Sequence, residues 1–382
     1  MKNFIAKDGN NILGTYKRLP VCFVRAEGEY LFDDQGNKYL DFLTGISVSV
    51  YGHNNLKIND AIKEQVEKLI HVSNLFYTES QISLAEKLNG FYGGGSKIFF
   101  VNSGAEANEC AIKLARKYQE NQYEIITFDN SFHGRTLATL TATGQRKVQQ
   151  GFDPLPDGFK YAVFNDLNSV KQAVTAKTVA VMLELIQGEG GVHIADKQFV
   201  KDLSAFCEEK GLLLIVDEIQ TGIGRTGKIF AYEHYGIKPD IVTLAKALGA
   251  GLPLGAVIVN DKYKNIFGYG AHGSTFGGNI VACSAALAGL EQLTAEQLSY
   301  INEMGAYFKS RLKEITDNVR GLGLMIAMEP KTMPDDLVGQ ALKEGFIINI
   351  VQDKTIRFLP SYFVSKESID ALVEFLKSAI NR

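Results

Sequence analysis

The sequence predicts an α/β fold with two domains, in which a large domain contains a mainly parallel sheet and a smaller domain is α+β in character. Between residues 97 and 260, short apolar runs rich in β-branched residues alternate with helical stretches. Such runs are typical of strands buried on both faces of a parallel sheet. After residue 280 this alternation stops. The length of 382 residues is sufficient for two domains and a buried site.

The elements of the large domain follow in chain order. Before them, within the first fifty residues, an antiparallel hairpin is expected in GEYLFDDQGNKYLDF, because DDQGN suits a short turn. Helices are expected at 105–118 and at 198–210, where the pattern is amphipathic. Apolar runs predict strands at 97–101 (KIFFV), 124–128 (EIITF), 178–183 (TVAVML), 212–216 (LLLIV), 240–244 (DIVTL) and 256–259 (AVIV).

The last hundred residues predict the smaller domain. A helical stretch from about 280 to 316 precedes short strands near 322–327, 346–351 and 355–359. A closing helix is expected at 366–380. This order of elements differs from the strand–helix alternation before it, so a separate α+β unit follows.

Composition and charge exclude several classes of protein. Lysine and arginine number 40 against 43 acidic residues, so the net charge of −3 gives no footprint for nucleic acid or an anionic membrane. The apolar runs are too short to span a bilayer, and the opening residues, MKNFIAKDGN, lack the apolar core of a signal peptide. A cytoplasmic protein is therefore expected. The 4 cysteines and 6 histidines are dispersed, which argues against a disulfide framework or a metal site.

The polar residues that follow the predicted strands form a candidate site, because ligands of an open parallel sheet bind beyond the carboxyl ends of its strands. Each segment taken alone has an ordinary structural explanation, so the prediction depends on their coincidence. The segments are 102–106 (NSGAE), 129–135 (DNSFHGR), 184 and 187–191 (E and QGEGG), 217–220 (DEIQ) and 245–247 (AKA).

Two of these segments suit a ligand with both an anionic and a cationic end. Ser103, Gly104 and Ala105 at a helix start offer free backbone N–H groups to an anion, although a plain serine N-cap would also explain them. Asp217 follows five apolar residues and needs a partner. Either a helix N-terminus or a cationic ligand would supply it.

Lys246 is the most unusual residue of the set, since its flanks, TLAKALGAGLPLG, are apolar and rich in glycine. Burial lowers the pKa of an ammonium group from about 10.4 and makes the amine nucleophilic. The alternative is a lysine whose amine reaches solvent. One cofactor would use all of these groups together, with Phe132 stacked on its ring, and that cofactor is pyridoxal 5′-phosphate.

Two glycine motifs indicate other ligands only weakly. Residues 222–228 (GIGRTGK) match a Walker A loop, but Ile229 replaces the hydroxyl residue that binds Mg²⁺, and no strand directly precedes the loop. Residues 268–273 (GYGAHG) fit GxGxxG, but they lack the preceding strand and the following helix. Nucleotide binding is expected at neither.

Beyond these single features, the chain resembles the class III (ω-amino acid) aminotransferases of the fold type I pyridoxal phosphate family. The resemblance implies a large cofactor-binding domain over residues 53–280, a small domain formed by residues 1–52 and 281–382, and a homodimer with shared active sites. It runs through TYKRLPV, LDFLTGISV, HVSNLFY, NSGAEANE, FHGRT, IQGEGGV, VDEIQTGIGRTG, LAKALGAGLPLGA, HGSTFGGN and IRFLP.

The resemblance also implies a role for each matching residue. Lys246 would bind the cofactor covalently and Asp217 would pair with its ring nitrogen, and both would be catalytic. Glu189 would pair with Arg357 and leave it when a dicarboxylate arrives. The other cofactor-binding residues would be Ser103, Gly104, Ala105, Phe132, His133, Ile219, Gln220 and, from the neighbouring subunit, Thr275. The other substrate-binding residues would be Tyr16, Arg135, Glu184 and Ser274, with Glu184 beside the cofactor hydroxyl. No metal is implied.

The implied reaction moves the δ-amino group of N2-acetyl-L-ornithine to 2-oxoglutarate, as in arginine biosynthesis. Succinylornithine, ornithine, 4-aminobutyrate and N-succinyl-diaminopimelate are alternative amines. An aminomutase would not need both Arg135 and Arg357, and a cofactor-sensing regulator would carry an added basic segment. Leu185 and Ile280 stand where the family usually has proline, so the loops next to the site are expected to differ in geometry.

Overall fold

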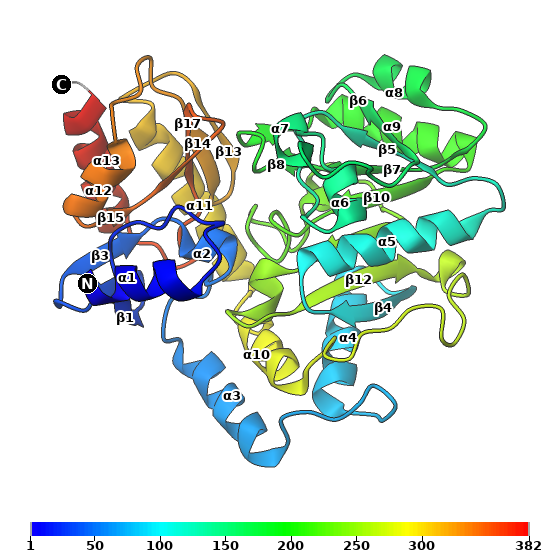
Figure 1. Ribbon diagram of the computed structural model, residues 1–382, viewed down its shortest axis with the longest axis horizontal. Coiled ribbons are helices and arrows are strands. Elements are labelled where there is room, and N and C mark those ends of the chain that lie inside the picture. The colour runs from blue at the N-terminus through cyan, green and yellow to red at the C-terminus, as the bar shows by residue number, and fades with distance from the viewer. Residues whose placement is uncertain (1, 381–382) are drawn as a thin grey trace.

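The computed structural model describes residues 2–380 and divides them between two regions (Figure 1). One region contains a seven-stranded sheet, and the other contains two four-stranded sheets together with both chain ends. In spatial order, the strands of the large sheet are β4 (Ser96–Val101), β12 (Gly255–Asn260), β11 (Ile241–Leu244), β10 (Leu213–Asp217), β7 (Thr178–Glu184), β5 (Glu124–Phe128) and β6 (Phe159–Ala162).

The large sheet is mainly parallel, as predicted. Only β12 is antiparallel to its neighbours, β4 and β11, and the remaining pairs are parallel. The predicted strands agree with the observed ones to within one or two residues, but β6 was not predicted, because its four residues, FKYA, form no continuous apolar run. The expected fold class is therefore confirmed.

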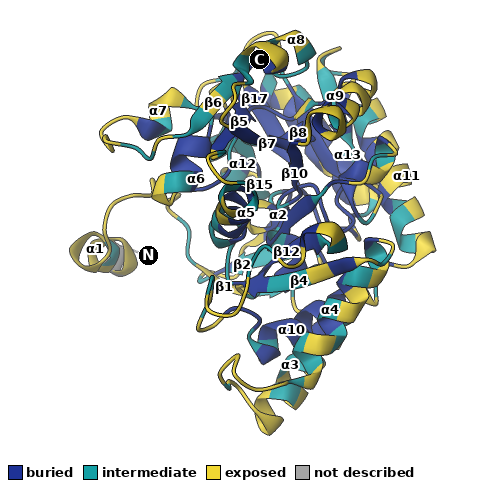
Figure 2. Cartoon of the chain, turned by 90° about the vertical axis from the view of Figure 1, so that its right-hand side faces the viewer, coloured by how far each residue is buried: buried dark blue, intermediate teal, exposed yellow. Residues whose placement is uncertain are grey.

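The central strands are apolar on both faces because helices cover both faces. Along β10, Leu213 and Ile215 pack in one core cluster with residues of α5 (Gly104–Tyr118). Leu214 and Val216 point the other way and pack in a second cluster with residues of α9 (Lys197–Lys210). Every residue of β7 and β10 is buried (Figure 2). Each such aliphatic side chain contributes about 1.5–3 kcal/mol to folding.

The remaining helices of this region surround the sheet. One group packs together beside β4 and consists of α3 (Leu56–Lys68), α4 (Glu79–Phe91) and α10 (Ile280–Leu290). The others are α6 (Leu137–Ala142), α7 (Arg146–Gln149), α8 (Leu167–Ala173) and the short 3₁₀ helices η1 (Ala231–His234), η2 (Lys246–Gly249) and η3 (Asp261–Tyr263). A two-stranded ribbon is formed by β8 (Ile186–Gln187) and β9 (His193–Ile194).

The smaller region joins the two ends of the chain. Its first sheet contains β1 (Phe23–Glu27), β2 (Tyr30–Asp33), β3 (Lys38–Asp41) and β15 (Phe346–Ile347), and its second contains β13 (Val319–Leu322), β14 (Met325–Met328), β17 (Thr355–Phe358) and β16 (Asn349–Val351). Its main helices are α11 (Ala295–Leu312), α12 (Leu337–Lys343) and α13 (Lys366–Ile380). The helix expected over 280–316 is thus two helices, α10 and α11. The domain limits at residues 53 and 280 stay a prediction.

The N-terminal segment stands apart from the rest of the chain. Helix α1 (Lys2–Asn11), which was not predicted, lies away from the body of the molecule and is largely exposed (Figure 2). A short turn, α2 (Thr44–Ser47), lies near η2. None of the helices within residues 2–380 is long and apolar enough to cross a membrane.

The Walker-like loop at residues 222–228 holds the two regions together. Arg225, in its middle, is fully buried. Its guanidinium donates to Ser47 Oγ at 3.0 Å and to the carbonyl oxygens of Leu324 and Pro360 at 3.0 and 2.8 Å, all in the smaller region. The motif therefore serves a structural purpose here.

Candidate active site

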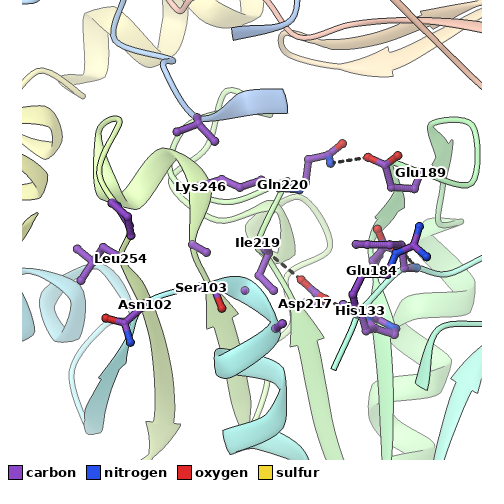
Figure 3. A pocket seen from close by; sticks show the side chains of 18 of the residues that line it. Asn102, Ser103, His133, Glu184, Glu189, Asp217, Ile219, Gln220, Lys246 and Leu254 are labelled. Atoms are coloured by element: carbon purple, nitrogen blue, oxygen red, sulfur yellow. Dashed lines mark hydrogen bonds and ion pairs between the residues drawn. The ribbon is translucent and has the colours of Figure 1, made fainter. Parts of the chain in front are cut away.

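A cavity of about 490 Å³ lies beyond the carboxyl ends of β4, β5, β7, β10 and β11. It is where the sequence predicted a site, because the ends of parallel strands meet at one edge of the sheet. Twelve of the predicted residues line it: Ser103, Gly104, Ala105, Phe132, His133, Arg135, Glu184, Glu189, Asp217, Ile219, Gln220 and Lys246. Figure 3 shows most of them around the opening between β10 and the start of α5.

The start of α5 presents backbone N–H groups to the cavity. Ser103 is the N-cap, and its Oγ accepts from Glu106 N at 3.2 Å. The N–H groups of Gly104 and Ala105 lie in the first turn of the helix, where no intrahelical acceptor exists. A Cβ atom added to Gly104 would lie 2.8 Å from Ile219 Cδ1, so glycine is needed for this close approach. The serine thus acts as a cap and leaves two donors for an anion.

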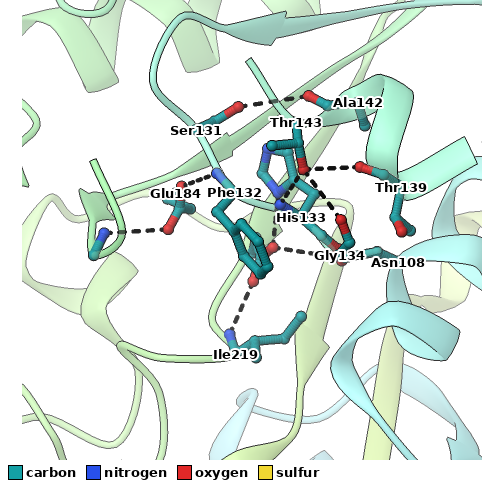
Figure 4. A network of polar contacts seen from close by, with 12 residues as sticks. Asn108, Ser131, Phe132, His133, Gly134, Thr139, Ala142, Thr143, Glu184 and Ile219 are labelled. Atoms are coloured by element: carbon teal, nitrogen blue, oxygen red, sulfur yellow. Dashed lines mark hydrogen bonds and ion pairs between the residues drawn. The ribbon is translucent and has the colours of Figure 1, made fainter. Parts of the chain in front are cut away.

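Asp217 ends β10 and is buried among hydrogen-bond donors. Figure 4 labels the residues that supply them, Asn108, His133 and Ile219. Its Oδ2 accepts from Asn108 Nδ2 at 2.8 Å and lies 2.8 Å from His133 Nδ1, and its Oδ1 accepts from Ile219 N at 3.0 Å. A carboxylate so close to His133 Nδ1 keeps the ring proton on that nitrogen. The three donors fix the position of the carboxylate at the edge of the cavity.

Glu184, at the end of β7, is a second buried carboxyl group beside Asp217. It accepts from Phe132 N at 2.8 Å and from Gly188 N at 3.3 Å. Burial raises its pKa to about 7, although the nearby His133 works in the opposite direction. Glu184 therefore gains or loses a proton near neutral pH.

Lys246 follows β11 and faces Asp217 and Glu189 across the cavity (Figure 3). It begins η2 with a left-handed backbone, at a φ of +47°. Burial lowers the pKa of its amine, and the charges of Glu189, Asp217 and Glu184 partly oppose that shift. A larger fraction of the amine is thus uncharged and nucleophilic than in water.

Arg357, on β17, reaches the cavity through Glu189 and Gln220. Its Nη1 is 2.5 Å from Glu189 Oε1 and donates to Gln220 Oε1 at 3.2 Å, while Nε donates to Asn349 Oδ1 at 3.3 Å. The side chain is fully buried, and its Nη2 has no partner among the described residues. Although burial alone would raise the pKa of Glu189, the positive charges of Arg357 and Lys246 lower it.

Besides Arg357, three predicted residues do not line this cavity within one chain. Thr275 and Tyr16 are exposed, and Tyr16 lies in the N-terminal segment with 76% of its surface accessible. Ser274 lies beside the cavity, because its Oγ accepts from Asn102 Nδ2 at 3.2 Å and Asn102 is a lining residue. The two positions where proline is usual lie close by: Leu185 is buried between β7 and β8, and Ile280 is the first residue of α10.

Sequence reasoning missed Asn108, which lies inside α5, because nothing in its neighbourhood marked it as a partner of Asp217. Asn102, which lines the cavity, belongs to the predicted segment 102–106, but no role was expected for it. The apolar residues Val48, Leu252, Pro253 and Leu254 also line the cavity, and they carry no distinctive pattern.

Comparison with known proteins agrees with this architecture. A family model described as aminotransferase class III matches residues 14–380, so the chain belongs to the class III aminotransferases and is an enzyme of that family. It is 49% identical to the acetylornithine aminotransferase of Methanocaldococcus jannaschii, over 98% of this chain and 97% of that protein. It is 46% identical to the acetylornithine aminotransferase of Aquifex aeolicus, over 97% and 99% of the two chains.

Solved structures of the same architecture lie further away in sequence. The ornithine aminotransferase of Toxoplasma gondii superposes with a TM-score of 0.93 at 29% identity, covering all of this chain and 94% of that one. Another structure of that protein, with the same TM-score of 0.93 and 29% identity over 99% and 94% of the chains, has pyridoxal phosphate at partial occupancy in its active site. A Bacillus anthracis aminotransferase gives a TM-score of 0.94 at 29% identity, covering 100% and 98% of the chains.

Proposed function

We propose that this enzyme catalyses the reversible, pyridoxal 5′-phosphate-dependent transfer of the δ-amino group of N2-acetyl-L-ornithine to 2-oxoglutarate. The products are N-acetyl-L-glutamate 5-semialdehyde and L-glutamate. The observation that carries the proposal is that Lys246, Asp217 and the start of α5 line one cavity, where a single cofactor would contact all three. The names of the most similar relatives support the choice of amine.

The residues of the cavity fit pyridoxal phosphate. The free N–H groups of Gly104 and Ala105 suit its phosphate. Phe132 and Ile219 both line the cavity and would form the two walls of a slot for its ring. Asp217, whose carboxylate is positioned by three hydrogen-bond partners, suits the ring nitrogen. When bound, the cofactor would supply an electron sink for the carbon that carries the amine.

The chain's own residues would do the rest. Lys246 Nζ would bind the cofactor and, once released by the incoming amine, would move the proton at the substrate carbon. Its lowered pKa favours this role, because an uncharged amine can accept that proton. Asp217 would keep the ring nitrogen protonated, and His133 and Asn108 would hold its carboxylate in place.

Two arginines would bind the substrate carboxylates. Arg135 is exposed at the mouth of the cavity and would take the carboxylate of the acetylated amine. Arg357 would take the α-carboxylate of 2-oxoglutarate, and its unpaired Nη2 is a donor available for the second oxygen of a bidentate pair. Glu189 would neutralise Arg357 during the other half-reaction.

We also propose that the active form is a homodimer with shared sites. Thr275 does not line the cavity of its own chain, so it would complete the cavity of a partner, as the family resemblance implies. The loop that carries Thr275 lies beside exposed apolar side chains, among them Leu75 at 87% and Phe276 at 61% exposure, which is unusual for a surface in contact with water.

The cofactor assignment is tested by chemical trapping. The purified enzyme is reduced with borohydride, digested and mapped by mass spectrometry. The cofactor is expected on Lys246, and an adduct on any other lysine would refute the assignment.

The substrate is tested in half-reactions without the second substrate. The cofactor absorbance is followed after addition of N2-acetylornithine, N2-succinylornithine, ornithine, 4-aminobutyrate or N-succinyl-diaminopimelate. The acetylated amine is expected to react with the highest specificity constant, and a faster reaction with another amine would replace the proposed substrate by that amine.

A further inference from the structure

The loop that carries Glu189 is held at its main chain. It connects β8 to β9, and Val192 N donates to Gln187 O at 2.8 Å across its base. Gly188 N donates to the buried Glu184 at 3.3 Å. Both ends of the loop are therefore fixed to the large region.

A second arginine, Arg320, binds the same loop from the smaller region. Arg320 donates to Gly191 O twice, from Nε at 2.9 Å and from Nη2 at 2.6 Å. It is itself anchored, because Nη2 lies 2.5 Å from Glu329 Oε1 and 3.3 Å from Thr355 Oγ1. Only 18% of the Arg320 side chain is exposed, so this contact is largely shielded from water. Gln352 adds a weaker, exposed contact from Nε2 to Glu189 O at 3.0 Å.

The two arginines lie on one row of the same sheet. Arg320 on β13 pairs with Ala327 on β14, and Ala327 pairs with Arg357 on β17. Residues directly opposite in neighbouring antiparallel strands share a face of the sheet. Both arginines therefore project from the same face of this sheet. Arg357 contacts the side chain of Glu189, and Arg320 contacts the main chain of Gly191, two residues further along the loop.

The glycines next to Glu189 are places of close packing. A Cβ atom added to Gly188 would meet Gln220 Oε1 at 2.2 Å, and one added to Gly190 would meet Asn130 O at 2.6 Å. A shift of the loop would break these contacts together with those of Arg320. The side chain of Glu189 is less restricted, since 28% of it is exposed and it also borders a neighbouring cavity of about 710 Å³.

We propose that Arg320 is a positioning residue for the exchange at Arg357: it holds the main chain of the loop still, so that only the side chain of Glu189 moves when a dicarboxylate arrives. This inference rests on the proposed function, which requires Glu189 to leave Arg357 in one half-reaction and to return in the other. A loop held at a fixed distance from Arg357 returns the carboxylate to the same place in every cycle. If the main chain of the loop moved, the Glu189 carboxylate would pair less readily with Arg357 after each cycle.

The test uses Arg320→Lys, which keeps the charge beside Glu329 but loses the two-pronged contact with Gly191 O. The matched control is Arg311→Lys, because Arg311 also pairs with carboxylates of the smaller region but has no contact with the loop. In the substrate-free holoenzyme, hydrogen–deuterium exchange over residues 188–192 is expected to rise at least about threefold in Arg320→Lys and to stay unchanged in the control.

The functional readout compares the two half-reactions. The apparent dissociation constant for the amine donor is expected to rise about 3- to 10-fold in Arg320→Lys, the range for one lost hydrogen bond, while that for 2-oxoglutarate stays equal or falls. In a Glu189→Ala background, the same Arg320→Lys change is expected to leave the ratio of the two constants unaltered, because the side chain through which Arg320 acts is gone.

Three results would overturn the inference: unaltered exchange in the loop, an equal decline of both half-reactions, or an Arg320 effect that persists without Glu189. Failure of the proposed function is seen separately. If another amine reacts in place of N2-acetylornithine, the half-reactions are measured with that amine, and the exchange experiment needs no substrate.

Discussion

Removing the carboxylate of Glu189 leaves Arg357 as a buried charge without an ionic partner among residues 2–380. The side chain of Arg357 is fully buried and that of Glu189 is 28% exposed. Loss of one partner of a buried ion pair costs about 3–5 kcal/mol, and partial solvent access to Glu189 reduces this to about 2–3 kcal/mol. An unfolding entropy of about 2.1 cal/mol/K per residue converts that loss into a Tm decrease of about 3 °C for a chain of 382 residues.

The assay is thermal unfolding of Glu189→Ala and wild-type holoenzyme with and without glutarate, an unreactive dicarboxylate. Glutarate is expected to stabilise the variant more than the wild type, because it does not have to displace Glu189 from Arg357. At about 100 times its dissociation constant, a ligand contributes about 2.7 kcal/mol, enough to restore most of the loss.

The matched control is Glu314→Ala, which removes two ion pairs at the surface, with Arg311 and Lys377. The side chains of Arg311 and Glu314 are 25% and 40% exposed, so this change is expected to cost less than about 1 kcal/mol. Two results would refute the assignment of Glu189 as the neutralising partner of Arg357. One is an equal Tm decrease in Glu189→Ala and Glu314→Ala, and the other is an equal Tm increase on adding glutarate to Glu189→Ala and to the wild type.

Three further outcomes are expected. In Gly104→Ala, the new Cβ atom would lie 2.8 Å from Ile219 Cδ1, so equilibrium titration should give weaker cofactor binding, and unchanged affinity would contradict the slot at the start of α5. Burial raises the pKa of Glu218 from 4.5 to about 7, so stability is lost as the pH rises through this window. Between pH 5 and pH 8, the free energy of unfolding in urea should fall by about 3 kcal/mol less in Glu218→Gln than in the wild type. An equal fall in both proteins would exclude Glu218 as its source. In Thr275→Ala, cofactor affinity should fall about tenfold while light scattering still reports a dimer, and full affinity would contradict the shared site.

The positions of the main strands, and of the central residues that are proposed to hold the cofactor, could be predicted from the sequence. A continuous apolar run such as 212–216 predicts a strand buried on both faces, and a parallel sheet brings the residues after such strands to one edge. Asp217 and Lys246 were found in this way. Both signals are local in the chain, because they depend on the residues next to them and on a general rule of strand order.

The contacts that link the two regions could not be predicted in this way. Arg320 and Gly191 are 129 residues apart, and Arg357 and Glu189 are 168 apart. The pairing of Arg357 with Glu189 was expected only from the family resemblance. The hydrogen bonds from Arg320 to Gly191 were not expected at all. No local pattern marks such contacts, because they form only when one sheet row of the smaller region packs against a loop of the larger one.

The sequence by itself determined the fold class, the edge of the sheet at which the cavity lies, and the residue types that line it. The tertiary structure alone decided that β12 runs antiparallel, that Asn108 holds Asp217, that the Walker-like loop is a buried bridge through Arg225, and that Thr275 does not reach the cavity of its own chain. The physical reason is the range of the interactions. Strand formation depends on side chains a few residues apart, whereas these contacts depend on the packing of whole elements.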